Sequence, residues 1–191
     1  MCDEITGVKK NEKKARKDRV IIMLGKMKQS PMDPLFTMDE VAAQEEELVL
    51  DSFTQKDVKV LGDIMHQINE EYQMAFAFEI YVNGLTVYKF LPEGTGKINA
   101  LWMEKKIETV MTMGYSTMRY WILTDSIGVK RNPDFYPTEP IVRCGGGFPI
   151  RVKSAGVIGA IACSGPGDQN DHLFCIEALR RLKKQMADKK Q

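Results

Sequence analysis

The sequence lacks the features on which several classes of protein depend. It has no apolar run near the roughly 20 residues that a membrane-spanning helix needs. Its 27 basic and 26 acidic residues almost cancel, so no chain-wide charge of one sign attracts nucleic acid or a membrane surface. We therefore expect neither nucleic acid nor a membrane as a partner.

Cysteine is scarce, and its spacing matches no common metal site. The four cysteines, Cys2, Cys144, Cys163 and Cys175, form no CxxC pair and no zinc-knuckle pattern. A chain of 191 residues buries enough surface to fold without disulfide bonds, so we expect free thiols, two of them buried. The sequence also shows no nucleophilic triad of serine, histidine and acid, and no paired carboxylates of the glycosidase kind.

The first part of the chain is rich in basic residues. The first 20 residues hold seven Lys or Arg against four acids, and the apolar stretch from Val20 to Leu24 is too short for a secretory signal. A cytoplasmic location is therefore expected. We predict a basic extension over residues 1–37, a single domain over residues 38–187 and a tail over residues 188–191. The basic ends are candidates for docking onto an acidic partner.

Helix and strand signals alternate from the start of the predicted domain. Thr37 begins a helix that stops before Val49, and the six acids from Asp39 to Asp51 predict a solvated face. A short strand is expected over residues 48–53.

Two longer helices follow. Thr54 caps the first, with Asp57 completing a weak capping box, and His66 lies off its apolar stripe and is expected at the surface. Asn99 caps the second, and Gly114 ends it. The predicted buried face of this second helix consists of Leu101, Ile107, Val110 and Met111.

Two hairpins account for the clearest strands. Asn83-Gly84 lies between two runs of aromatic and β-branched residues and suits a type I′ turn. The remaining expected elements are a strand over 118–124, a loop over 125–143, a hairpin of 148–152 with 157–162, and an amphipathic helix over 170–187. Since hairpins make antiparallel sheets, the fold class is α+β, with an antiparallel sheet of five to six strands covered by helices.

A glycine run provides the first candidate binding segment. In Cys144-Gly145-Gly146-Gly147, the glycines let a ligand approach the main chain closely, their amides can form an anion-binding nest, and Arg151 adds a cation. The alternative is that the run only makes a tight entry into the next strand.

The segment before the last helix is the second candidate binding segment. The free amides near Ser164 and Gly165 suit a carboxylate or phosphate at a helix N-terminus, with Asp171 and His172 in the first turn. His172 is a candidate proton carrier or metal ligand. The alternative is that Asp168 or Asn170 caps the helix and His172 is simply packed or exposed.

The third candidate lies on the second long helix. Asn99, Trp102 and Lys106 follow the spacing i, i+3, i+7 and can share a face. Trp102 can stack on a flat ligand whose acid groups meet Lys106. The alternative places Trp102 in a subunit interface and leaves the lysines solvated. Together these residues suit an anionic, planar ligand, and they suit an oligomer interface nearly as well.

Four segments, in order, resemble the haem-degrading-domain (GlcG/HbpS-like) family in its uncharacterised branch. They are residues 44–62, 94–106, 144–152 and 156–180, which begin QEEELVLDSF, GTGKINALWM, CGGGFPIRV and GVIGAIACSG. The resemblance implies a profilin-like fold, assembly into dimers or larger rings, and a link to haem or other tetrapyrroles or to protein assembly. The family usually has histidine before its Gly-Gly pair, whereas this chain has Cys144.

These observations favour a non-catalytic role. The expected function is an oligomeric binding or assembly protein that holds a small anionic planar ligand or a protein partner, with haem as the candidate cofactor. The alternative is a haem-handling or haem-degrading enzyme that depends on Cys144 or His172.

Overall fold

A four-stranded antiparallel sheet organises the computed structural model, which describes residues 33–129 and 137–189. The strands are β1 (Ala77–Val82), β2 (Leu85–Phe90), β3 (Gly147–Val152) and β4 (Gly156–Ser164), in the order β2-β1-β4-β3. Both predicted hairpins are confirmed. At the β1–β2 turn, Asn83 and Gly84 have φ of 50° and 86°, as a type I′ turn requires.

The pairing of β1 with β2 contains a bulge. Ile80 lies opposite Tyr88 and Tyr81 lies opposite Thr86, so Val87 is an extra residue on β2. A bulge changes which side chains reach each face of a sheet. Here Tyr88 follows the extra residue and packs on the same hydrophobic core as Ile80.

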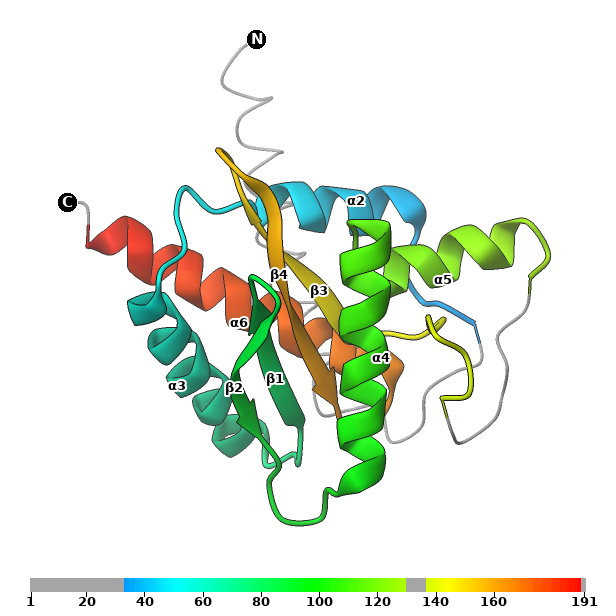
Figure 1. Cartoon of the computed structure of the whole chain (residues 1–191), viewed down its shortest axis with the longest axis horizontal. Helices are drawn as coiled ribbons and strands as arrows, with labels where there is room; N and C mark the ends of the chain where they lie inside the picture. The colour runs from blue at the N-terminus through cyan, green and yellow to red at the C-terminus, as the bar shows by residue number, and fades with distance from the viewer. Residues whose placement is uncertain (1–32, 130–136, 190–191) are drawn as a thin grey trace, which may run out of the picture.

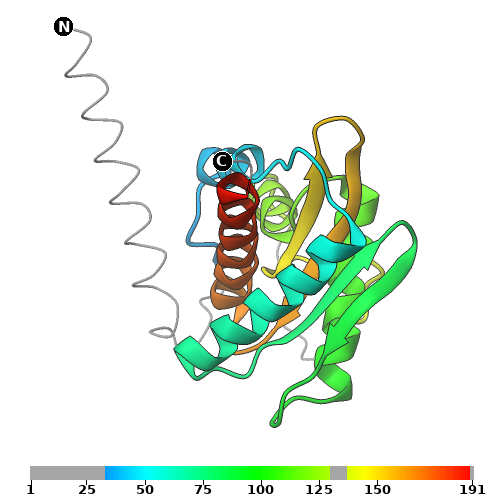
Figure 2. The same cartoon turned by 90° about the vertical axis from the view of Figure 1, so that its left-hand side faces the viewer.

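Helices cover both faces of the sheet (Figures 1 and 2). The helices α3 (Gln55–Tyr72) and α6 (Asp168–Asp188) cover one face and form the main core. The helix α4 (Lys97–Met113) lies on the other face, against Ala77, Ala160 and Ala162. These alanines alternate along their strands with large core residues such as Phe78 and Ile161, as the two faces of a sheet require.

Two shorter helices pack together beside the sheet. The helix α2 (Met38–Glu47) begins at the predicted cap Thr37, whose backbone N–H donates to Glu40 Oε2 at 2.9 Å. The helix α5 (Thr117–Ser126) contributes Met118 and Trp121 to a small cluster with Val41. The prediction of a strand over residues 118–124 was therefore wrong, because Met118 and Trp121 bury at helical spacing.

The predicted strand over residues 48–53 was also wrong. Leu50 forms a single parallel bridge with Val152, and the backbone then turns toward the helix that begins after Thr54. The fold class is α+β as predicted, but the sheet has four strands rather than five or six. Residues 1–32, 130–136 and 190–191 are outside the described parts, and with them most of the predicted extension, part of the predicted loop and Cys2.

Most acids of the predicted solvated face are exposed, namely Asp39, Glu46, Glu47 and Asp51, but Glu45 is not. Glu45 is buried, accepts from Ser116 N at 2.9 Å and pairs with Arg119. Glu47 pairs with Arg180 of α6. These partners lie far along the sequence, so the run of acids by itself could not reveal them.

Smaller corrections concern α4 and α6. Met111 is 37% exposed, and Met103 occupies the core instead. Asn99 is the third residue of α4, and its Oδ1 accepts from the N–H of the capping residue Gly96 at 3.0 Å. The predicted end at Gly114 is confirmed, with φ of 74°. Gly167 caps α6 in place of the predicted Asp168 or Asn170.

Candidate functional site

A buried ion pair lies at the centre of the sequence-predicted site. Lys106 Nζ of α4 is 2.7 Å from Asp171 Oδ2 of α6, and their side chains are 2% and 5% exposed. Lys106 Nζ also donates to the carbonyl of Cys163 at 2.6 Å. Asp171 Oδ1 accepts from Gly165 N at 2.8 Å. The pair therefore joins both helices to the end of β4.

The pair carries its charges at neutral pH. Burial by itself lowers the pKa of Lys106, but Asp171, together with Cys144, Cys163 and Asp168, outweighs it and holds that pKa above its ordinary value. Burial raises the pKa of Asp171 to about 6, against the lowering effect of Lys106. A buried charge that loses its partner costs roughly 3–5 kcal/mol, so this pair is essential to the fold around it.

The glycine run packs against protein rather than open space. A Cβ at Gly145 would lie 1.8 Å from the carbonyl oxygen of Asp168, and one at Gly146 would lie 2.5 Å from Asp171 Cβ. Gly146 also has φ of +90°, which disfavours any other residue. The run therefore allows the first turn of α6 to approach the start of β3.

Further predicted residues join the ion pair at the end of β4. Asn99 Nδ2 donates to Ser164 Oγ at 3.1 Å and to Ser164 O at 3.3 Å. A Cβ at Gly165 would lie 2.4 Å from Phe76, so this glycine is also closely packed. We refer to this group as the buried cluster, and its members are Asn99, Lys106, Gly146, Ser164, Gly165 and Asp171.

Three thiols surround the buried cluster. Cys144, Cys163 and Cys175 are all free and buried, one more than predicted. Cys175 Sγ donates to the Gly146 carbonyl at 3.5 Å, and burial raises the pKa of the Cys163 thiol. A protonated thiol is a poor metal ligand. Within the described ranges no three side chains of His, Cys, Asp or Glu are grouped to hold a metal ion.

His172 and Arg151 are placed apart from the buried cluster. His172 is fully buried, with Nε2 3.0 Å from Gln44 Oε1 and its ring against Phe36. Burial lowers the pKa of His172 to about 3, so its ring is neutral. Arg151 lies at the opposite end of β3 and donates to the Gly114 carbonyl at 2.7 Å. Trp102 is half-buried on α4.

One polar pair was not anticipated from the sequence. His66 is half-buried, not at the surface, and its Nε2 lies 2.8 Å from Tyr88 Oη. Its ring contacts Phe90, with centroids 4.3 Å apart. Gly62, one turn earlier on α3, leaves room for the Tyr88 ring, which would lie 2.9 Å from a Cβ there. The sequence signal for this contact was Gly62, four residues before His66, because a glycine inside a helix can mark a place where another side chain packs closely.

Comparison with known families identifies the chain's relatives. The family model described as "Haem degrading protein HbpS-like" matches residues 53–180. The chain belongs to this HbpS-like family. The match begins within the segment before α3 and ends in α6, so it spans the whole sheet and both polar groups described above.

The HbpS-like chain is also similar to proteins of the UPF0303 group. It is 30% identical over 149 residues to one from Paraburkholderia phymatum, covering 78% of this chain and 90% of the relative. It is 29% identical over 162 residues to one from Streptomyces coelicolor, covering 82% and 98%. It is 28% identical over 156 residues to one from Psychromonas ingrahamii, covering 79% and 96%.

Solved structures share the HbpS-like fold at lower identity. The Ybr137w protein superposes with a TM-score of 0.70 at 20% identity, over 80% of this chain and 91% of that one. HbpS superposes with a TM-score of 0.55 at 17% identity, over 72% and 95%. A PduOC complex with haem gives 0.52 at 16%, over 68% and 94%. None of the helices in the described part is both long and apolar enough to cross a membrane.

Haem is the group that the HbpS-like family implies, and the two polar groups fit it differently. Haem needs a donor for its iron and cations for its acid groups. Lys106 of the buried cluster already neutralises Asp171, and His172 and the three thiols outside the cluster are enclosed as well. The half-buried His66 and Tyr88 are nearer the surface. The roles of the buried residues as ligands stay a prediction.

Proposed function

We propose that this HbpS-like protein is a non-catalytic homo-oligomeric binding protein for haem or a similar flat, anionic tetrapyrrole. The non-catalytic assignment depends on the ion pair between Lys106 and Asp171. Because these two charged groups of the buried cluster bind each other and the backbone, neither is available to act on a ligand. Membership of the family and a structural neighbour in complex with haem support the tetrapyrrole.

The state of the other titratable groups supports binding without catalysis. A general acid or base must come within hydrogen-bond reach of the group it acts on. His172 is fully buried and neutral, and Cys163 is buried with a raised pKa. Neither group can exchange a proton with a bound molecule while the fold stays closed.

A haem titration followed by absorption spectroscopy tests this function. We expect a saturable, stoichiometric shift of the Soret band, and a spectrum that stays stable when ascorbate and oxygen are added. Absence of saturation would contradict haem binding. Loss of the Soret band with appearance of an open tetrapyrrole would contradict the non-catalytic assignment.

The alternative function is haem degradation, which the description of the family favours. It requires a reductant and oxygen, and it predicts that Cys144→Ala or His172→Ala abolishes turnover. Full turnover in both variants would exclude these two residues as the catalytic groups. Binding without turnover in the parent protein would exclude the enzyme.

Exposed apolar side chains on α5 support the proposed assembly. Leu123 and Ile127, one turn apart, are 41% and 70% exposed, and Val129 follows them. Exposed apolar patches often mark interfaces between proteins. We expect light scattering after size-exclusion chromatography to give a multiple of 21.7 kDa, and Ile127→Lys to reduce it. A monomeric parent protein would contradict a homo-oligomer and leave a different protein as the partner.

A further inference from the structure

Two of the buried thiols lie in contact with each other. Cys163 is on β4 and Cys175 is on α6, and both are free and fully buried. The Gly146 carbonyl accepts from Cys163 N at 2.7 Å and from Cys175 Sγ at 3.5 Å. The Cys163 thiol also forms a hydrogen bond with the Cys175 thiol. The strand and the helix therefore hold two sulfur atoms side by side.

The face of α6 that meets β4 also supplies a carboxylate to this pair. Asp171 lies one turn before Cys175 on α6, so the two side chains leave the helix on the same face. Cys163 Sγ donates to Asp171 Oδ1 at 3.8 Å. The Cys163 thiol thus has a proton acceptor on one side and a second thiol on the other. An acceptor beside a thiol is the arrangement by which proteins generate a nucleophilic sulfur.

The contact between the two thiols suits a disulfide bond. Such a bond requires cysteine side chains that point at each other from neighbouring backbone segments. The hydrogen bond between the two thiols shows that the side chains meet, and the shared Gly146 carbonyl keeps β4 and α6 close at this point. The bond would connect the strand to the helix inside the main core.

We propose that Cys163 and Cys175 are a redox-modification site, at which hydrogen peroxide forms a disulfide bond that locks α6 onto β4. This inference does not depend on the proposed function. The Cys163 sulfur attacks one peroxide oxygen, the O–O bond breaks, and the leaving hydroxide takes the thiol proton as water. The Cys175 sulfur then attacks the resulting sulfenic acid, the sulfur–oxygen bond breaks, and a second water leaves. Two thiols are oxidised to one disulfide, and one peroxide is reduced to two molecules of water.

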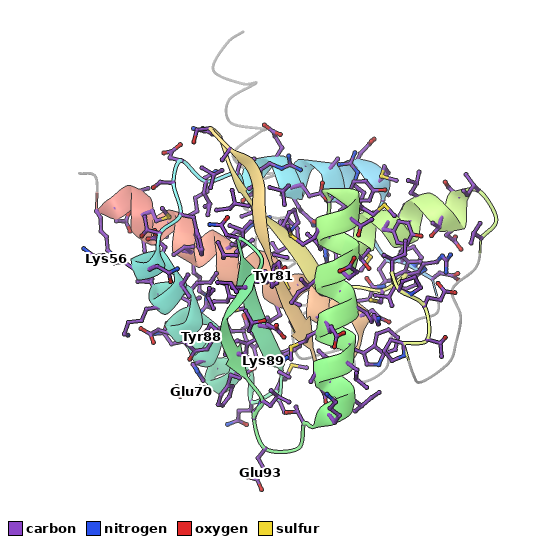
Figure 3. All side chains as sticks on the ribbon, viewed as in Figure 1. Lys56, Glu70, Tyr81, Tyr88, Lys89 and Glu93 are labelled. Carbon is purple, nitrogen blue, oxygen red and sulfur yellow. The ribbon has the colours of Figure 1, made fainter. Side chains whose placement is uncertain are left out.

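The enclosure of the pair determines which oxidant reaches it and how fast. Side chains fill the space between the sheet and α6 (Figure 3), and both thiols are fully buried. Burial raises the pKa of the Cys163 thiol, so little thiolate is present while the fold is closed. Oxidation therefore requires a small oxidant and local opening of the fold. The pair responds to sustained rather than brief exposure to peroxide.

A peptide map of the full chain tests the site directly. The protein is exposed to hydrogen peroxide, denatured with iodoacetamide to block the thiols that remain, and digested with trypsin. Trypsin leaves Cys163 and Cys175 in one peptide, residues 154–180, and Cys144 in another, residues 144–151. We expect the first peptide to lose two hydrogen atoms and to resist iodoacetamide, whereas Cys144 stays reactive. A first peptide that gains oxygen, or whose two thiols stay reactive, would overturn the site.

Two variants separate this disulfide from unspecific oxidation. Cys175→Ser should leave Cys163 as a sulfenic acid that dimedone labels, because the thiol that displaces its oxygen is gone. Cys144→Ser, the matched control, should form the disulfide like the parent protein. Loss of the disulfide in Cys144→Ser would overturn the pairing of Cys163 with Cys175. The peptide map of the parent protein decides the pairing even where a variant folds poorly.

The locking effect is measured on the parent protein alone. The oxidised protein should unfold at a higher urea concentration than the reduced protein, because the disulfide constrains the unfolded chain. Dithiothreitol should restore the original midpoint. A midpoint that oxidation leaves unchanged or lowers would overturn the lock.

Discussion

The Lys106–Asp171 pair joins the helices α4 and α6, and the His66–Tyr88 pair joins the helix α3 to the strand β2. The two pairs differ in the kind of interaction and in burial. Lys106 and Asp171 are almost completely enclosed, and their remaining hydrogen bonds are with the backbone of Cys163 and Gly165 and with the Cys163 thiol. His66 and Tyr88 are hydrogen-bonded partners that are both half-buried. Enclosed charges stabilise a fold only as a pair, whereas a half-buried hydrogen bond contributes only about 1 kcal/mol. The first pair is therefore a structural element, whereas the second is a local contact that contributes less to stability.

The comparison is tested most strongly by breaking the ion pair. We expect Lys106→Met to lower the free energy of unfolding by roughly 3–5 kcal/mol, because Asp171 is left buried and unpaired. Urea unfolding followed by circular dichroism measures the change. Lys105→Met, at the neighbouring position on α4, is the control and should cost less than about 1 kcal/mol. A similar loss in both variants would show that the pair has no special structural role.

The buried imidazole of His172 predicts a dependence of stability on pH. Its pKa is about 3 in the folded protein and near 6.5 when unfolded, so the unfolded state binds more protons between these values. Stability is therefore complete above pH 6.5 and falls as the pH drops toward 3.

A variant isolates this contribution from that of Asp171. The parent protein should lose roughly 3 kcal/mol more than His172→Gln between pH 7 and pH 4, since a tenfold change in proton concentration between the two pKa values of His172 is worth about 1.4 kcal/mol. Urea unfolding at the two pH values gives the difference. The raised pKa of Asp171 acts in the opposite direction but is common to both proteins. Parallel pH curves for the two proteins would contradict a neutral buried His172.

The glycine run can be tested with a pair of glycines of similar backbone conformation. Gly146 and Gly156 have φ of +90° and +73°, but only Gly146 has neighbours within 4 Å of an added Cβ. We expect Gly146→Ala to cost about 2 kcal/mol more than Gly156→Ala, because it adds a packing clash to the same backbone strain. Thermal and urea unfolding measure both. Equal costs would mean that close packing does not explain Gly146.

The smallest expected effect on stability belongs to the His66–Tyr88 pair. Tyr88→Phe removes one half-buried hydrogen bond, which contributes about 1 kcal/mol. Urea unfolding should place it close to Tyr81→Phe, a control on the other face of the neighbouring strand. A loss near that of Lys106→Met would instead show that this hydrogen bond is as important to the fold as the ion pair.

Much of the fold could be predicted because its signals are local. The Asn83-Gly84 turn, the caps of α2 and α3 and the end of α4 at Gly114 each depend on a few adjacent residues. The strand expected over residues 118–124 failed for the opposite reason. Its aromatic and apolar residues suit either element, and the contact of Trp121 with Val41 of α2 decides for a helix.

The candidate site was predictable only as a set of residues. Helical spacing placed Asn99, Trp102 and Lys106 on one face, and the structure joins Asn99 to Ser164 and Lys106 to Asp171. Spacing could not show that Lys106 is buried, because its partner lies 65 residues away. His66 was misplaced for the same reason, since Tyr88 is 22 residues away on another element.

The sequence by itself determined the family, the α+β class, both hairpins and most helix ends, because each depends on composition and short-range geometry. Only the tertiary structure decided which polar side chains are enclosed and which stay near solvent. That outcome depends on contacts between distant elements, such as α4 with α6 and α3 with β2. In such contacts the free energy of a charge is set by the partner it meets and the water it loses.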